Sequence, residues 1–197
     1  MVILLGGKAE KTSQSQKILQ TAFHCLSTKG YANVSMRDIA DEAGVALSQL
    51  HYYYKNKEGL FTEVIKMMMH QYLHEVEDKL KSTPNTKEKI SSLVRYFNEL
   101  IRKKPELLKL FIDFTAQSLW LPSFRKQLKS LFSDLSEMIE KSILAGTAIN
   151  KNLLEYSSKS VAKLVLGALY GTSIQIMLDP EEEKTFDSLN MIGIILN

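Results

Sequence analysis

Apolar side chains recur at intervals of three and four residues along almost the whole chain, and this spacing is the strongest constraint on the fold. Ile18, Ala22 and Leu26 show the pattern near the N-terminus. Residues spaced in this way share one face of an α-helix. No segment shows the sustained two-residue alternation that is typical of strands. We therefore expect an all-α fold of about nine helices.

Few residues interrupt this helical pattern. The sequence holds only 9 glycines and 4 prolines, and all the prolines lie at expected helix boundaries. The expected helices cover residues 13–28, 36–43, 47–53, 60–80, 90–101, 107–119, 124–145, 153–178 and 182–196. The change from short to long helices predicts an N-terminal tail over 1–12, a first domain over 13–59 and a second domain over 60–197.

Charge and cysteine content narrow the class of protein. Among 197 residues there are 25 Lys and Arg against 22 Asp and Glu, which gives a net charge of +3. This balance does not suit a protein that coats nucleic acid by bulk charge, so any basic surface must be local. The single cysteine, Cys25, allows no disulfide within the chain,. The apolar run Val2 to Leu5 is shorter than the apolar core of a signal peptide, and no stretch approaches a membrane span,. We expect a cytoplasmic protein with no membrane partner.

Two short helices separated by a tight turn carry the strongest functional signal. Ser35 is suited to cap the first of these helices, and Gly44 is suited to the turn between them,. Ala40 is small where the second helix must pass closely, and Leu50 is spaced to face a shared core. This spacing is typical of a helix-turn-helix, whose second helix enters the major groove of DNA. The alternative is an ordinary helical hairpin inside a bundle.

A wider pattern surrounds this hairpin. Its residues are Gly30, Ser35, Ile39-Ala40, Ala43-Gly44-Val45, Leu50, Tyr52-Tyr53-Tyr54 and Lys55-Asn56-Lys57-Glu58-Gly59-Leu60. Through them, residues 13–65 resemble the TetR family of one-component transcriptional regulators. The resemblance implies a three-helix DNA-binding domain followed by a helical domain that binds a ligand and dimerises.

The sequence departs from the family pattern at three positions. Ala46 stands where a Ser or Thr usually caps the recognition helix, and Ser48 stands where glycine is common. His51 stands where the aromatic run usually begins with tyrosine. These departures leave the fold signal intact, but they leave open which side chains contact phosphate.

The resemblance and the helical geometry together predict contacts with DNA. Ser35 and Lys57 are expected to hold phosphates, through a helix N-terminus and a cation. Gln49 is suited to pair with adenine, and Leu47 is suited to contact a thymine methyl. The predicted DNA-binding residues are Ser35, Arg37, Leu47, Ser48, Gln49, His51, Tyr52, Tyr53 and Lys57. For each of them the alternative is a solvated or packing residue, and Tyr54 is expected to lie in the core.

The second domain is expected to join two copies of the chain. One recognition helix reads few base pairs, and a dimer reads two half-sites of a pseudo-palindrome. The resemblance implies a homodimer through the last two helices, 153–178 and 182–196. Small residues at Gly167 and Gly171 allow close approach of another helix. The alternative is that 153–178 is the central core helix of its own subunit.

Aromatic and polar residues on the middle helices are candidates for a ligand pocket. The predicted pocket residues are Tyr96, Phe97, Phe111, Phe114, Thr115, Ser118, Trp120 and Tyr170. Asp113 or Glu99 is a candidate counter-charge for a cationic ligand. Because aromatic residues at helical spacing also build ordinary cores, the plain packing interpretation stays open.

Other constellations carry weaker signals. His70 and His74 lie four residues apart, which suits either a metal pair or a solvated helix face, and no third ligand is evident,. Cys25 suits buried packing, with redox sensing as the alternative. No nucleophile–base arrangement is present, so we expect neither an enzyme nor a cofactor. We predict a dimeric repressor that a small-molecule effector releases from its DNA operator. The alternative is a DNA-binding interaction protein without such a switch.

Overall fold

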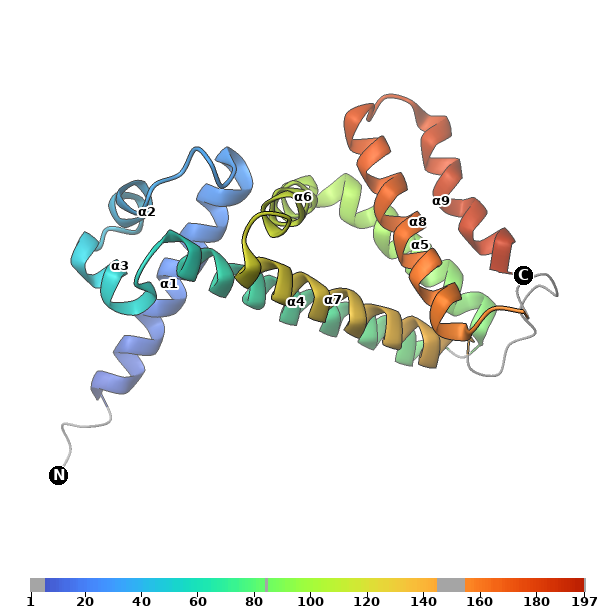
Figure 1. The fold of residues 1–197 in the computed structure, drawn as a ribbon, viewed down its shortest axis with the longest axis horizontal. Helices are drawn as coiled ribbons and strands as arrows, with labels where there is room; N and C mark the ends of the chain where they lie inside the picture. Colours follow the sequence, from blue (N-terminus) through green and yellow to red (C-terminus); the bar gives the residue numbers. More distant parts are fainter. Residues whose placement is uncertain (1–5, 84, 145–154, 197) are drawn as a thin grey trace. The chain divides into compact units, whose positions relative to one another are not determined.

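The computed structural model describes residues 6–83, 85–144 and 155–196 and is all-helical over them (Figure 1). These residues form nine α-helices and one π-helical turn, and none of them lies in a strand. The elements are α1 Gly6–Lys29, α2 Met36–Ala43, α3 Leu47–Tyr54, α4 Lys57–Ser82, α5 Thr86–Lys103, α6 Pro105–Ser118, α7 Pro122–Ile139, η1 Glu140–Leu144, α8 Ser158–Leu178 and α9 Glu183–Leu196. The prediction of an all-α fold is confirmed.

The chain divides into two compact units, and each unit consists of two separate segments of the sequence. Unit 1 comprises Met1–Met68 and Lys109–Phe124, and unit 2 comprises Met69–Leu108 and Arg125–Asn197. The predicted boundary at residue 59 falls inside unit 1, because α4 continues unbroken through it. A later segment of the chain, which includes most of α6, returns to complete unit 1.

Some helix ends differ from the prediction. Helix α1 already begins at Gly6, inside the expected tail, because residues 8–11 are Lys, Ala, Glu and Lys, which favour helix,. Helix α8 begins after Ser157, whose hydroxyl accepts a hydrogen bond from the Ser160 N–H at 3.2 Å. The expected earlier start at 153 lies outside the described residues. Helix α7 gives way to the π-helical turn η1.

Four aromatic rings build the core of unit 1. This aromatic cluster consists of Tyr31, Phe61, Phe114 and Phe124, and its three phenylalanines are fully buried. Tyr31 stacks on Phe61 with ring centroids 4.8 Å apart, and Phe124 meets Phe61 edge-on at 5.1 Å. The cluster therefore joins the loop after α1 to α4, α6 and α7, and it explains why residues 109–124 belong to unit 1.

Unit 2 is built around α8. Helices α8 and α9 lie side by side (Figure 1), and both contact α5. In the described part of the chain, α8 is the helix that is long and apolar enough, by length and composition, to cross a membrane, with a mean hydropathy of 1.5. The prediction that no stretch approaches such a span is wrong for α8, because it carries only two lysines among long aliphatic side chains. Its apolar window is 39% buried within the chain, and buried core helices pass the same test.

Candidate nucleic-acid interface

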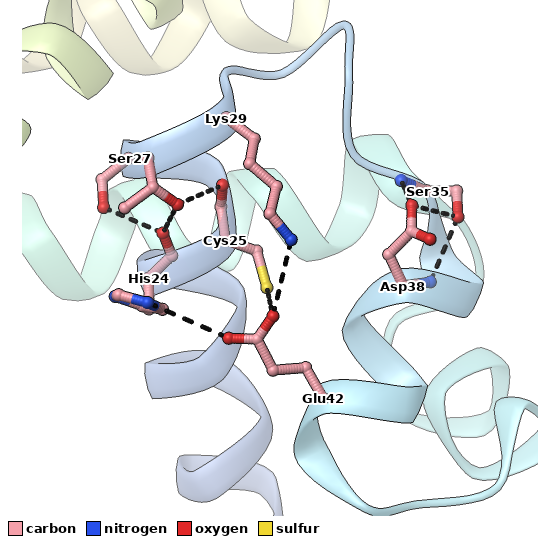
Figure 2. A network of polar contacts seen from close by, with 8 residues as sticks. His24, Cys25, Ser27, Lys29, Ser35, Asp38 and Glu42 are labelled. Carbon is pink, nitrogen blue, oxygen red and sulfur yellow. Dashed lines mark hydrogen bonds and ion pairs between the residues drawn. The ribbon is translucent and has the colours of Figure 1, made fainter.

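Helix α2 begins with a complete capping box. The Ser35 hydroxyl accepts a hydrogen bond from the Asp38 N–H at 3.1 Å and donates one to Asp38 Oδ2 at 2.7 Å (Figure 2). Asp38 Oδ2 also accepts the Ser35 N–H at 2.7 Å. These hydrogen bonds hold the pKa of Asp38 below its usual value. The predicted cap is therefore confirmed, and an exposed helix N-terminus lies where the sequence places a phosphate contact,.

The turn after α2 sets the direction of the next helix. Gly44 takes a left-handed conformation with φ of 64°, which glycine adopts without strain,. Its N–H donates to the Asp41 carbonyl at 3.1 Å, and the Val45 N–H donates to the Ala40 carbonyl at 3.0 Å. The apolar side chains expected to face the shared core are buried: Ile39, Ala40, Ala43 and Leu50. This arrangement is the helix-turn-helix that the spacing predicts.

A carboxylate braces α1 against α2. Glu42 accepts a hydrogen bond from the Cys25 thiol at 3.2 Å, and Lys29 Nζ lies 3.7 Å from the same oxygen (Figure 2). Its other oxygen lies 4.0 Å from His24 Nε2. Burial, together with Glu42, raises the pKa of Cys25 to about 11. The thiol is therefore a protonated packing group, as the packing interpretation holds, and the brace itself has no signal in the sequence.

Helix α3 replaces the missing cap in an unexpected way. Ala46 precedes the helix and has no side-chain oxygen to offer. Instead, Gln49 turns back, and its Oε1 accepts the Ala46 N–H at 3.2 Å. The side chain predicted to read adenine therefore also stabilises the start of the helix that carries it.

The residues of α3 divide between core and surface as a recognition helix requires. Leu50 and Tyr54 are buried, and the Tyr54 hydroxyl donates to the Ser15 carbonyl at 3.0 Å, which confirms Tyr54 as a core residue. Tyr52 is 72% exposed and contacts Tyr53 edge-on at 5.4 Å. The exposed side chains are Ser48, Gln49, His51 and Tyr52, and the half-buried ones are Leu47 and Tyr53. The six predicted contact residues of α3 thus all reach the surface at least in part.

The end of α3 is held by His51. Its Nδ1 lies 2.8 Å from the carbonyl oxygen of Lys55, and the Lys55 N–H donates to the His51 carbonyl at 2.9 Å. These bonds support Lys55 at a φ of 61°, which is rare for a residue with a side chain,. Asn56 then accepts the Gly59 N–H at 2.8 Å and starts α4. With Nδ1 engaged, Nε2 is the ring nitrogen of His51 that is left for the predicted phosphate contact.

Lys57 lies at the start of α4, above an aromatic ring. Its Nζ is 4.2 Å from the ring centroid of Tyr31. Partial burial lowers the pKa of Lys57, whereas the carboxylates of Asp113 and Asp38 act to raise it. The carboxylate of Asp38, in the capping box of α2, thus attracts the Lys57 ammonium. Arg37, the remaining predicted contact, is exposed on α2.

The structure distributes the predicted ligand-pocket residues over both units. Those in unit 1 are Phe111, Phe114, Thr115, Ser118 and Trp120, and those in unit 2 are Tyr96, Phe97 and Tyr170. Phe114 is fully buried in the aromatic cluster, whereas Trp120 is 80% exposed. The Tyr96 hydroxyl donates to Glu75 at 3.2 Å, and burial raises the pKa of Tyr96. The pocket stays a prediction.

Two cavities in unit 2 are lined by other residues. One, of about 350 Å³, lies between α5 and α9 beside Arg95 and Asn190. The other, of about 530 Å³, lies beside Glu140 and Lys159. No group of three or more metal-ligating side chains occurs among the described residues. His70 and His74 place their ring centroids 4.8 Å apart on α4, and both are exposed.

The N-terminal domain has the features of a DNA-binding helix-turn-helix. They are the capped start of α2, the left-handed turn at Gly44 and the half-exposed α3. Residues 18–64 match the family model described as bacterial regulatory proteins, tetR family. The chain therefore carries the N-terminal helix-turn-helix domain of the TetR family. This family consists of transcriptional regulators and not of enzymes, which confirms the prediction that the protein is not an enzyme.

Relatives of known name agree with this assignment. The fatty acid metabolism regulator protein of Bacillus subtilis is 28% identical over 85 residues, which cover 43% of this chain and 44% of that protein. The chain is thus matched over less than half the length of this curated relative. Among solved structures, a TetR transcription regulator from Haloarcula marismortui has a TM-score of 0.80 at 17% identity, covering 94% of this chain and 97% of that one. FadR from Bacillus subtilis in complex with stearoyl-CoA has a TM-score of 0.70 at 19% identity, covering 92% and 99%. These structures share the fold.

Proposed function

We propose that this protein is a homodimeric transcriptional repressor that binds a pseudo-palindromic DNA operator and is released from it by a small molecule. The observation that carries the proposal is the surface of α3. Four of its eight side chains are exposed, while its other face is packed into a helix-turn-helix core. A helix presented in this way fits the major groove.

The proposed contacts fall into two kinds. Gln49, Ser48 and Leu47 face base edges, and Gln49 pairs with adenine through its amide. The second kind of contact is with phosphates, which fixes the position of the helix without reading sequence. The groups that make it are the N-terminus of α2 at Ser35 and the side chains of Arg37, Lys57, His51, Tyr52 and Tyr53. The Gln49 amide nitrogen takes no part in the cap, because Oε1 accepts the Ala46 N–H. Its donor group is therefore oriented by the cap, which favours a defined base contact.

The proposed dimer uses α8 and α9. Leu164 and Leu178 on α8 are 60% and 81% exposed, and Met191 and Ile194 on α9 are 55% and 72% exposed. Such an apolar surface is a liability for a monomer and is typical of a helix–helix interface. Gly167 and Gly171 have no atom within 4 Å of an added Cβ, so a partner helix can approach there. Pairing doubles the DNA contacts and sets the half-site spacing.

Release by a ligand follows from preferential binding to one of two conformations. A ligand that prefers the form with wrongly spaced recognition helices lowers affinity for the operator by the ratio of its two affinities. FadR of Bacillus subtilis, which shares the fold, has been solved with stearoyl-CoA, and this supports a ligand-responsive role here.

Selection of bound duplexes from a random DNA library tests the proposal. We expect enrichment of a sequence with two related half-sites, and binding that weakens as salt rises. Ile194→Asp is expected to produce a monomer in sedimentation and to weaken binding to the selected duplex. The matched control is Leu119→Asp, which alters an exposed leucine outside α8 and α9. Failure to enrich any sequence over random DNA at all salt concentrations refutes the proposal.

A further inference from the structure

Asp113 on α6 forms a link with the loop that precedes α2. Its Oδ2 accepts the Tyr31 N–H at 2.5 Å, and its Oδ1 accepts a hydrogen bond from Gln117 Nε2 at 3.3 Å. Gly30 turns the chain at this point with a φ of 80°, and a Cβ there would lie 3.6 Å from Asp113 Oδ2. The two linked residues are 82 positions apart in sequence but belong to the same unit. The carboxylate therefore fixes the backbone position of Tyr31.

The ring of Tyr31 is in turn a support for Lys57. The ring stacks on Phe61 at 4.8 Å, and the Lys57 ammonium lies 4.2 Å from its centroid. A cation over a tyrosine face is attracted to the ring, and more strongly where water is partly excluded. Asp113 thus acts on Lys57 in two ways. It fixes the backbone of Tyr31, whose ring Lys57 covers, and its own charge attracts the ammonium.

We propose that Asp113 is a positioning residue that restrains Lys57 from full engagement with DNA phosphate. The inference rests on the proposed function, because it concerns the strength of a phosphate contact. To bind a phosphate, Lys57 gives up part of its attraction to Asp113 and to the Tyr31 ring, and the phosphate meets a nearby negative charge. Neutralising Asp113 removes both the pull on Lys57 and the repulsion of phosphate.

The sign of this effect separates it from a structural role. A carboxylate that only stabilises the loop weakens DNA binding when it is removed. A carboxylate that restrains Lys57 strengthens binding when it is neutralised, and the gain grows as salt falls. Each additional phosphate contact steepens the dependence of log K on log salt by about 0.9. One complete additional contact per subunit therefore makes the gain about 3.5-fold larger at 50 mM than at 200 mM salt.

The test measures binding of the full chain to random-sequence duplex DNA between 50 and 200 mM salt, since phosphate contacts do not require the operator. Asp113→Asn keeps an oxygen for the Tyr31 N–H and removes the charge, and Asp113→Ser is a second neutral variant. We expect both to bind more tightly with a steeper salt slope. Asp113→Glu, which restores the charge, is expected to return the slope toward that of the wild type.

Two controls complete the experiment. In the Lys57→Ala background, Asp113→Asn is expected to change the slope by less than it does in the wild type, because no ammonium is there to release and only the repulsion of phosphate is removed. Asp134→Asn removes an exposed carboxylate from α7 in unit 2 and controls for the change in net charge. If the wild type binds duplex DNA but both neutral variants leave the slope unchanged or weaken binding, the inference is wrong and the proposed function stands. If the wild type does not bind duplex DNA at any salt, both are refuted.

Discussion

Replacing Gly59 with alanine tests how closely α4 begins against the end of α3. A Cβ at this position would lie 2.4 Å from the backbone oxygen of Tyr54 and 3.3 Å from Asn56 Oδ1. Neither oxygen is free to retreat, because Tyr54 O accepts the Asn56 N–H at 2.7 Å and Asn56 Oδ1 accepts the Gly59 N–H at 2.8 Å. The added methyl group must therefore displace backbone at the junction that follows the recognition helix.

The magnitude follows from two opposing contributions to the free energy of unfolding. Forcing an extra methyl group into a packed site costs about 1–3 kcal/mol. Alanine in a helix is more favourable than glycine by about 0.5–1 kcal/mol. We expect Gly59→Ala to lower the free energy of unfolding by about 1–2 kcal/mol. Because the strained junction adjoins α3, affinity for DNA should fall as well.

Urea unfolding, followed by the loss of helical circular dichroism, measures this change. Gly167→Ala is the matched control, because no atom lies within 4 Å of a Cβ there. In the monomer it should stabilise by about 0.5–1 kcal/mol, whereas in the proposed dimer the added methyl group would meet the partner helix. Since Gly167 lies on the proposed dimer helix, both variants are compared at several protein concentrations. A Gly59→Ala protein as stable as the wild type would refute the steric argument.

Two further predictions concern the helix-turn-helix domain. Gln49→Glu keeps an oxygen for the Ala46 N–H but loses the amide that donates to adenine, so operator affinity should fall by about 1–3 kcal/mol with relaxed preference at one base pair. Competition shift assays measure both quantities, and unchanged affinity and preference in Gln49→Glu and Gln49→Ala would show that Gln49 reads no base. Cys25, with its pKa raised to about 11, should resist iodoacetamide at pH 8 in the folded protein and react once urea unfolds it,. Mass spectrometry follows the labelling, and rapid modification of the folded protein would contradict the buried, protonated state.

The parts of the fold that depend on neighbouring residues were predictable from the sequence. Ser35, Gly44 and Leu50 each act within a few positions of their own, and the structure confirms the cap, the turn and the core position. Which face of α3 is exposed follows from the same helical periodicity. The cap supplied by Gln49 was not foreseen, because the departure at Ala46 indicates a missing acceptor but not its replacement.

Contacts between distant residues had no comparable signal. Nothing in the spacing of Asp113 or Tyr31 indicates that they meet, since their hydrogen bond depends on how α6 packs against the loop after α1. Periodicity also does not distinguish a pocket aromatic from a core aromatic. Phe114 is expected near a ligand and lies in the aromatic cluster, whereas Trp120, just after the end of the same expected helix, is largely exposed. The predicted ligand pocket and dimer interface depend on such packing and stay predictions.

The discontinuity of unit 1 has a practical meaning for protein engineering. Phe61 is fully buried against Phe114 and Phe124. These two rings belong to the second segment of unit 1, Lys109–Phe124, which is separated from the first segment by part of unit 2. A fragment cut after Met68 would leave this ring without two of its partners, and it would lack the Asp113 contact to Tyr31. The DNA-binding domain therefore cannot be transferred to another protein as one continuous segment. To graft this domain onto another regulator, residues 109–124 must be included. Otherwise the recipient must supply a segment that packs against the exposed face of Phe61 in the same way.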